Sequence, residues 1–191
     1  MAVLSAVLSD ESIHQAVVEA GKLIAAAMKA GRKLMVCGNG GSAADAQHLA
    51  AEFVVRLSVD RPALRAIALT TDSSILTAVG NDYSYENVFE RQVEALGMEG
   101  DVLLAISTSG NSKNCVRALK AARSMGVHTV SFTGNGGGAM KALCEINVIV
   151  PSNTTGNIQE SHLALEHILS MIVERCVFGA EFGAGNQKSA E

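Results

Sequence analysis

Aromatic side chains are scarce in this chain, which has no Trp, two Tyr and five Phe among 191 residues. Aliphatic residues must therefore build most of the core, and a hydrophobic content of 48% supplies enough of them. Charged residues make up only 18% of the chain, and the mean hydropathy is +0.24. So little charge indicates that part of the surface is buried in an oligomer.

Clusters of Lys and Arg are also missing, and the net charge is -4 with an isoelectric point near 5.7. Without a basic patch, nucleic acid is excluded as a direct ligand. No apolar run approaches the ~18 residues of a membrane span. The opening MAVLSAVLS lacks a basic flank and is followed by Asp10 and Glu11, which argues against a secretory signal. These absences predict a cytoplasmic protein with no membrane association.

The four cysteines are widely spaced and form no C-x-x-C pair. They lie inside apolar patterns at Cys37, Cys115, Cys144 and Cys176. This usage predicts buried, reduced thiols rather than disulfides or a cysteine metal site.

Five short apolar runs predict buried strands at residues 33–37, 65–69, 102–106, 128–132 and 146–150. Helical spacing of Ala, Leu and Met fills the segments at 12–30, 43–57, 73–79, 85–96, 112–125, 137–143 and 158–178. Alternating strands and helices predict an α/β fold with a parallel sheet covered on both faces. The length fits a single domain over residues 1–191, with a flexible, Gly-rich tail from about residue 179.

Two glycine- and hydroxyl-containing loops follow predicted strands, at residues 37–42 (CGNGGS) and 107–112 (STSGNS). Glycine lets the backbone approach an anion closely, and a helix N-terminus favours a phosphate. Ser42, three residues before Asp45, resembles a capping box that opens a helix. The second loop carries four hydroxyls immediately before a helix. An ordinary Ser-rich helix cap is the alternative interpretation of this loop.

A dinucleotide site is a competing interpretation of the first loop, because Gly38, Gly40 and Ala43 match G-x-G-x-x-A. Such a site needs an acidic residue at the end of the second strand to bind the ribose. Asp60 has about the right spacing but precedes that strand, and Asp72 lies too far along the chain. A Walker A loop is excluded because neither loop contains Gly-Lys-Ser/Thr.

His48 and Glu52 are four residues apart on the helix that follows the first loop, so both side chains lie on one face within reach of a common ion. A solvated i,i+4 pair is the alternative. The last predicted helix has an unusual density of polar groups among its apolar residues. These are Gln159, Glu160, His162, Glu166 and His167.

Asn81 and Asp82 are a further candidate pair, which we expect in a loop. They have the chemistry to bind sugar hydroxyls, and a simple turn is the alternative.

Four blocks together resemble the phosphoheptose isomerases, a family of SIS-domain enzymes, across almost the whole chain. They read CGNGGSAADAQHLAAEF, ALTTDSSILTAVGNDYSYENVFERQVEALG, GDVLLAISTSGNS and IQESHLALEHIL. The resemblance implies a three-layer SIS fold with a five-stranded parallel sheet, and a homotetramer that uses its N- and C-terminal helices in oligomerisation. It implies conversion of sedoheptulose 7-phosphate to D-glycero-D-manno-heptose 7-phosphate, the first step towards activated heptose for lipopolysaccharide or related glycans.

The resemblance also implies one Zn²⁺ at each active site, with Glu52 and His167 as the acid/base pair. The implied metal ligands are His48, Glu52, Gln159 and His167. The implied residues that bind the sugar phosphate are Asn39, Gly40, Gly41, Ser42, Glu52, Asn81, Asp82, Ser107, Thr108, Ser109, Ser112 and Gln159.

The chemistry of the implied residues is consistent with this reaction. Moving a carbonyl between adjacent carbons needs a base for a carbon-bound proton and a donor to stabilise an enediolate. Glu52 can be that base, and His167 can move the oxygen-bound proton. Zinc would polarise the carbonyl or hold its oxygens in position.

Asn157 departs from the family, which usually has a basic residue just before Ile158 and Gln159. This departure affects the choice of ketose phosphate more than the class of reaction. A different interpretation is a non-catalytic SIS-domain protein, either a phosphosugar sensor or one that associates with the replication initiator. Such a protein would not need Glu52 together with His167, so the pair favours an enzyme.

Gln159 and His167 are eight residues apart, or about 12 Å along one continuous helix. One metal ion can hardly take both ligands from the same helix. The spacing therefore predicts either that the two come from different subunits or that Gln159 lies outside the helix. We expect a composite site at a subunit interface, where a second copy of the last helix lies beside His48 and Glu52.

Overall fold

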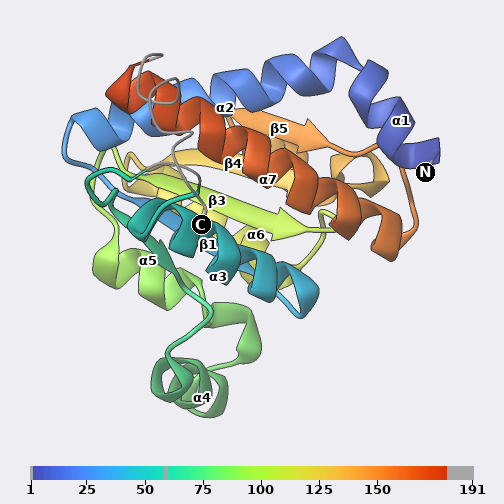
Figure 1. Ribbon diagram of the computed structural model, residues 1–191. Helices are drawn as coiled ribbons and strands as arrows, with labels where there is room; N and C mark the ends of the chain where they lie inside the picture. The colour runs from blue at the N-terminus through green and yellow to red at the C-terminus, as the bar shows by residue number, and fades with distance from the viewer. Residues whose placement is uncertain (1, 58–59, 180–191) are drawn as a thin grey trace, which may run out of the picture.

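The computed structural model describes residues 2–57 and 60–179 of the chain. A single sheet of parallel strands runs through it, in the order β2-β1-β3-β4-β5 (Figure 1). The strands are β1 (Leu34–Gly38), β2 (Ala66–Ala68), β3 (Val102–Ser107), β4 (His128–Thr133) and β5 (Ile146–Ile149). The predicted five-stranded parallel α/β sheet is confirmed.

Helices cover both faces of this sheet. They are α1 (Ala2–Ser9), α2 (Glu11–Lys29), α3 (Gly41–Val54), α4 (Ser73–Asp82), α5 (Glu90–Leu96), α6 (Lys113–Ser124) and α7 (Thr155–Phe178), with 3-10 segments η1 (Tyr85–Asn87) and η2 (Asn135–Ala142). Alternate strand residues enter different cores. In β1, Leu34 and Val36 pack with α2, α3 and α7, whereas Met35 and Cys37 pack with α5 and α6. The fold therefore has three layers.

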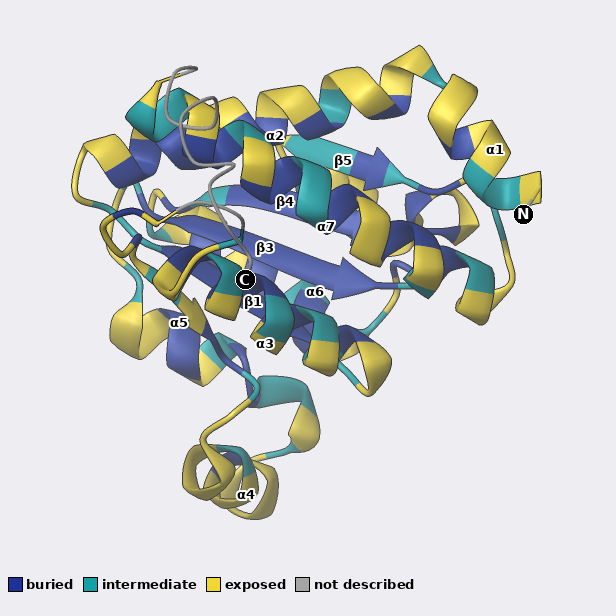
Figure 2. Cartoon of the chain, viewed as in Figure 1, coloured by how far each residue is buried: buried dark blue, intermediate teal, exposed yellow. Residues whose placement is uncertain are grey.

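The two edge strands differ from the prediction of wholly buried strands. In β2, Ile67 is 40% exposed, and three of the four residues of β5 are only half-buried. Figure 2 shows the contrast with β3, which is buried along its length. An edge strand has a neighbour on one side only, so an apolar run does not guarantee burial there.

The strand order places a topological switch point between β1 and β3. The chain passes from β1 to β2 on one side, whereas β3 pairs on the other side of β1. Ligands of such sheets bind in the crevice beyond the carboxyl ends of the strands at this point. Both candidate loops, 37–42 and 107–112, follow these two neighbouring strands.

Three local features differ from the sequence prediction. Helix α1 was not predicted, and the helix expected over residues 85–96 is divided into η1 and α5. The segment expected as a helix at 137–143 is the 3-10 segment η2, in which Gly136, Gly137 and Gly138 have positive φ. Because a helix requires negative φ, these glycines prevent a regular one.

Most of the predicted tail lies outside the described residues, since only Gly179 of residues 179–191 is described. Across the described ranges, no helix is both long and apolar enough to cross a lipid bilayer.

Candidate active site

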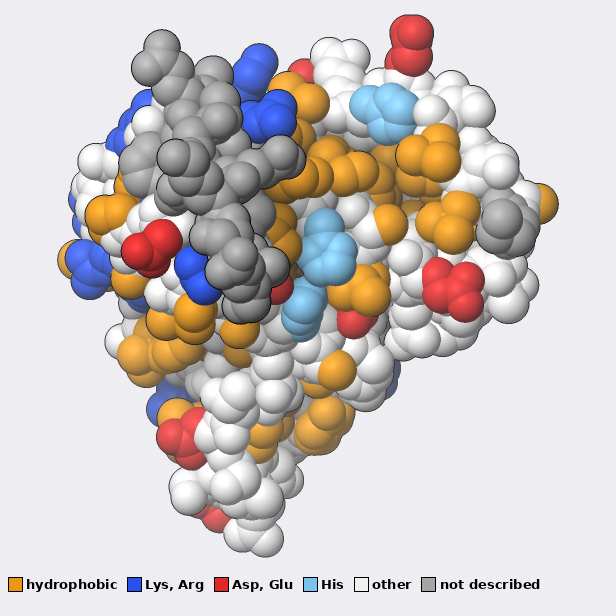
Figure 3. Space-filling model, in the orientation of Figure 1, with side chains coloured by type: hydrophobic (Ala, Val, Ile, Leu, Met, Phe, Trp, Pro, Cys, Tyr) orange, Lys and Arg blue, Asp and Glu red, His pale blue; other side chains and the backbone are white. Residues whose placement is uncertain are grey.

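The predicted acid and base lie where α3 and α7 run side by side. His48 and Glu52 are on α3, and His167 is on α7 of the same chain. The Nε2 atom of His48 lies 2.9 Å from Nε2 of His167 and 3.5 Å from Oε1 of Glu52. One ligand atom from each residue lies within 4.8 Å of the other two. Figure 3 shows histidine side chains gathered on this face, over α3 and α7.

The three residues of the His48–Glu52–His167 triad differ in their exposure to solvent. The side chain of His48 is 41% exposed, whereas that of Glu52 is 14% exposed. The second carboxylate oxygen of Glu52, Oε2, is buried and has no hydrogen-bond partner among the described residues. A small molecule can therefore approach the triad and meet a carboxylate that is largely removed from water.

These three residues fit a zinc ion in type and spacing. Two imidazole nitrogens and a carboxylate oxygen are donors that Zn²⁺ takes, and a catalytic site keeps its remaining position for water or substrate. Nitrogens on a tetrahedral zinc are about 3.3 Å apart, given bonds of about 2.0 Å. The separation of 2.9 Å between the two Nε2 atoms is close to this, and a small ring rotation would reach it.

Gln159 does not join the triad of its own chain. It lies on α7, which is a helix from Thr155 to Phe178, and this excludes the alternative that Gln159 sits outside the helix. A β-carbon added to Gly41 would overlap the amide of Gln159, which places Gln159 at the start of α3. His48 and His167 meet about two turns further along both helices.

The partner of His48 and Glu52 is also different from our expectation of a second copy of the last helix. The structure brings His167 of the same chain against them. A second copy is therefore not needed to complete the Glu52–His167 pair. Among the four implied metal ligands, only Gln159 is left for another chain to supply.

The hydroxyls of the second loop converge at the start of α6. Ser107 Oγ lies 2.9 Å from Ser112 Oγ and 3.4 Å from Ser109 Oγ. The loop turns at Gly110, whose φ is +64°. Ser112 is the N-cap residue of α6 but makes no side-chain capping bond. The amide of Cys115 donates to Asn114 Oδ1 at 2.9 Å, which leaves the two earlier amides of the helix for another acceptor. This geometry suits a phosphate better than the alternative of an ordinary Ser cap.

The first loop is held by residues that the sequence did not single out. Asn39 and Asn114 exchange two amide hydrogen bonds, of 2.9 and 2.8 Å. The hydroxyl of Tyr85 donates to Asn39 Oδ1 over 2.9 Å. Asn114 lies in the first turn of α6, directly after the second loop, and Tyr85 lies in η1, so these contacts tie the first loop to α6 and η1. No local sequence pattern marks either residue, because both partners are remote in sequence.

The capping box predicted from Ser42 and Asp45 is wrong. The N-cap of α3 is Gly40, which has φ +57° and no side chain to form a cap, and Ser42 is buried in the first turn. This helix end also keeps free donors. Asp72 does not support the dinucleotide interpretation, because its carboxylate already caps α4 by accepting from the backbone amide of Ile75 at 2.9 Å.

Asn81 and Asp82 end α4 rather than lying in a loop. Their side chains are exposed and hydrogen-bond to each other, with 2.8 Å from Asn81 Nδ2 to Asp82 Oδ1. Helix α4 projects from the body of the molecule in Figure 1. Among the described residues, this pair makes no hydrogen bond to either loop, although Tyr85, three residues after Asp82, reaches Asn39.

Two other polar residues of α7 belong to the interior. His162 is fully buried, with Nε2 3.2 Å from the carbonyl of Thr133, and burial lowers its pKa to about 4 against the opposing effect of that hydrogen bond. Glu166 is equally buried, and burial, with a smaller contribution from Asp45, raises its pKa to about 8. Neither side chain reaches the solvent-facing site.

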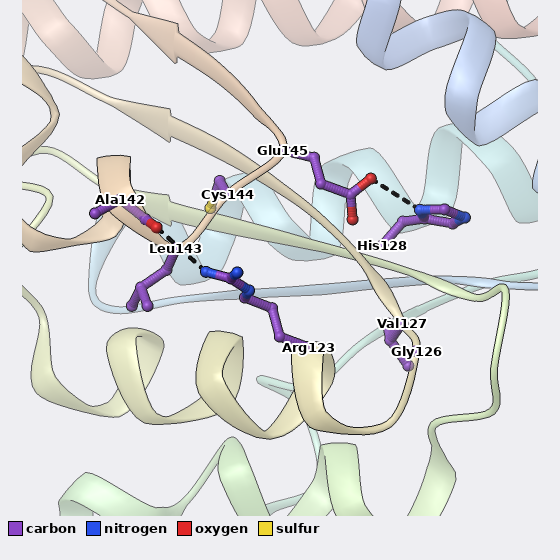
Figure 4. Close-up of a pocket in the computed structure, with 8 residues that line it drawn as sticks. All are labelled: Arg123, Gly126, Val127, His128, Ala142, Leu143, Cys144 and Glu145. Atoms are coloured by element: carbon purple, nitrogen blue, oxygen red, sulfur yellow. Dashed lines mark hydrogen bonds and ion pairs between the residues drawn. The ribbon is translucent and has the colours of Figure 1, made fainter.

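A separate hollow lies at the amino ends of β4 and β5 (Figure 4). Its polar groups are already paired, with 2.9 Å between His128 Nδ1 and Glu145 Oε2 and 3.2 Å from Arg123 to the carbonyl of Ala142. Burial raises the pKa of the Cys144 thiol in this hollow to about 12. That thiol is not a nucleophile at neutral pH.

The four cysteines are free thiols, as predicted. Cys37 and Cys115 are buried, whereas Cys144 and Cys176 are only half-buried.

Comparisons with known proteins all point to one family. Residues 2–134 match the model of the family described as SIS domain. A phosphoheptose isomerase from Akkermansia muciniphila is 59% identical over 152 residues, which cover 80% of each chain. One from Burkholderia pseudomallei is 52% identical over 179 residues, covering 94% of this chain and 91% of the relative.

The chain also resembles the solved structure of a relative. The structure of a phosphoheptose isomerase from Neisseria gonorrhoeae matches with a TM-score of 0.79 and 44% identity, over 84% of this chain and 85% of that one.

Proposed function

Because the chain belongs to the SIS domain family and is a sugar-phosphate isomerase, we propose that it converts sedoheptulose 7-phosphate to D-glycero-D-manno-heptose 7-phosphate through an enediolate. The observation that carries this proposal is the His48–Glu52–His167 triad, which combines a shielded carboxylate with two imidazoles. The product would feed activated heptose for lipopolysaccharide or related glycans. The reaction would take place in the cytoplasm, within a single domain spanning residues 1–191.

Glu52 is the general base of the proposed reaction. It takes the proton from the hydroxyl-bearing carbon next to the carbonyl. The protonated carboxyl exchanges its proton with solvent and then delivers a proton to the former carbonyl carbon. His167 moves the oxygen-bound proton between the two oxygens, so that the enediolate collapses to the aldose. The side chain of Glu52 is only 14% exposed, so little water competes with the substrate for the carboxylate.

His48, Glu52 and His167 would hold the zinc ion, which supplies charge to stabilise the substrate's oxygens. The two carboxylate oxygens of Glu52 allow this residue to be both a metal ligand and the general base. Oε1 faces His48 at 3.5 Å and suits the metal, whereas Oε2 is unpartnered and suits the proton. Gln159 of a second copy is the fourth proposed ligand, because its own chain places it about 12 Å away.

The phosphate would bind at the second loop, where Ser107, Ser109 and Ser112 converge at the start of α6. Thr108 belongs to the same loop. Asn39, Gly40, Gly41 and Ser42 would contact the sugar at the neighbouring start of α3. Asn81 and Asp82 project on α4 and would reach the site of another copy.

A homotetramer with sites at its interfaces is supported by apolar side chains on the outer face of the helical layer. Val18 of α2 and Leu163 and Met171 of α7 are each 37 to 40% exposed. Burial against another copy would remove them from water. This use of α2 and α7 agrees with oligomerisation through the terminal helices.

The test is an NMR assay of the purified chain with sedoheptulose 7-phosphate, with and without zinc. We expect new aldose signals, which disappear after metal removal and return with Zn²⁺. The control is Glu52→Gln, which keeps the side-chain shape but cannot accept the proton. Binding of the sugar phosphate without conversion would contradict the proposal and favour a sensor. If the chain converted other ketose phosphates but not sedoheptulose 7-phosphate, only the proposed substrate would change. Asn157, where the family usually has a basic residue, leaves room for that outcome.

A further inference from the structure

Arg61 is a fully buried cation close to the active site. Its side chain is 0% exposed, and its guanidinium group donates to four acceptors. Nε donates to Glu174 Oε1 at 2.7 Å, and NH2 donates to the backbone carbonyl of Glu52 at 2.6 Å. NH1 donates to the carbonyls of Phe53 at 2.7 Å and Pro62 at 3.2 Å.

Two of these acceptors belong to the last turn of α3, which ends at Val54. The last carbonyls of a helix have no partner within the helix, and the helix dipole favours a cation there. Arg61 supplies both the donors and the charge. A planar guanidinium is suited to this task because its N–H groups point in fixed directions to several acceptors at once.

Glu174 connects this helix end to α7. It lies seven residues after His167, two turns along the same helix, and its side chain is only 7% exposed. Its Oε1 also accepts from the amide of Leu57 at 3.4 Å. Arg61 thus ties the backbone of Glu52 to the helix that carries His167.

We propose that Arg61 is a positioning residue that fixes the carboxylate of Glu52 against His48 and His167. The inference rests on the proposed function of this triad. Without the guanidinium, the last turn of α3 loses two carbonyl partners and its link to Glu174. That turn carries Glu52, so the carboxylate would move relative to the two imidazoles while the phosphate loops, which lie elsewhere, keep their geometry.

The test compares Arg61→Lys with the wild-type protein, using Co²⁺ as a visible probe of the triad. Lysine keeps the charge but cannot donate to Glu52, Phe53 and Glu174 together. We expect the affinity for Co²⁺ and kcat each to fall about 10- to 100-fold, as for other residues that orient metal ligands. The absorption bands of bound Co²⁺ should shift, and KM should change by less than about threefold because the phosphate contacts remain.

Two further variants separate positioning from general stability. Val173→Ala removes a buried side chain next to Glu174. It should lower Tm but leave Co²⁺ affinity and kcat unchanged well below that temperature. Glu174→Gln keeps an acceptor for Arg61 but removes the charge, so it should shift the Co²⁺ bands in the same direction as Arg61→Lys. It also tests the inference if Arg61→Lys does not fold.

Wild-type Co²⁺ affinity and kcat in both Arg61→Lys and Glu174→Gln would overturn the inference and leave the proposed function intact. An equal loss of Co²⁺ affinity in Val173→Ala would also overturn it, because the effect would then be one of stability. If the wild-type chain neither bound Co²⁺ nor isomerised the sugar phosphate, the proposed function itself would fail.

Discussion

Mixing two inactive variants tests which chain supplies Gln159 to each site. In one chain, α7 carries Gln159 beside Gly41 and His167 beside His48, so the two α7 residues point to sites about 12 Å apart. If the metal takes Gln159 from a second copy, then Gln159→Ala and Glu52→Gln damage different halves of a shared site. Each variant alone should be almost inactive.

The expected recovery can be worked out from the geometry. In an equal mixture with random subunit exchange, half of the sites have an intact Glu52, and half of those receive an intact Gln159 from the neighbour. About a quarter of the wild-type activity should therefore return. A mixture of Glu52→Gln with His167→Ala should recover nothing, because those two residues belong to the same chain and every triad keeps a lesion.

The assay is the isomerase rate after mixing, with exchange verified by native mass spectrometry of variants that differ in mass. No recovery for the Gln159→Ala mixture despite complete exchange would refute the shared ligand. Recovery in the Glu52→Gln and His167→Ala mixture would refute the assignment of that pair to one chain.

Two other perturbations follow from the site and its surroundings. Burial lowers the pKa of His162 from 6.5 to about 4, so below pH 6.5 the unfolded chain binds a proton that the folded chain does not. The free energy of unfolding should therefore fall by about 2 kcal/mol from this residue between pH 7 and pH 5, and urea titrations should show a flatter acid dependence for His162→Gln; an unchanged dependence would contradict the buried neutral imidazole. Ser109→Ala and Ser112→Ala should raise KM more than they lower kcat, because phosphate contacts contribute equally to ground and transition states. A larger effect on kcat than on KM in steady-state kinetics would instead show that this loop takes part in the chemical step.

Much of the fold could be predicted because apolar runs and helical spacing are local signals. The strand at 102–106 corresponds to β3 within one residue, and the long last helix was expected at 158–178. The same signals failed where local context changed. Edge strands are less buried than their composition indicates, and three glycines with positive φ prevent a regular helix in η2.

The candidate site could be predicted only in part, because here too only local patterns are informative. His48 and Glu52 share a helix face, so their spacing was informative, and the resemblance to known isomerases added His167. The contacts of Arg61 with Glu52 and Glu174 join residues up to 113 positions apart, with no local pattern. The double hydrogen bond between Asn39 and Asn114 spans 75 positions. Such partners become visible only after the sheet brings α3, α6 and α7 together.

The most direct test of the central claim follows the carbon-bound proton itself. The wild-type protein and Glu52→Gln are incubated in D₂O with sedoheptulose 7-phosphate and Zn²⁺, and deuterium is measured at the two carbons that exchange the carbonyl. If Glu52 is the base, the wild type incorporates solvent deuterium at these carbons as the aldose forms. Glu52→Gln should bind the sugar phosphate without incorporating deuterium. Incorporation at the wild-type rate in that variant would contradict the role of Glu52.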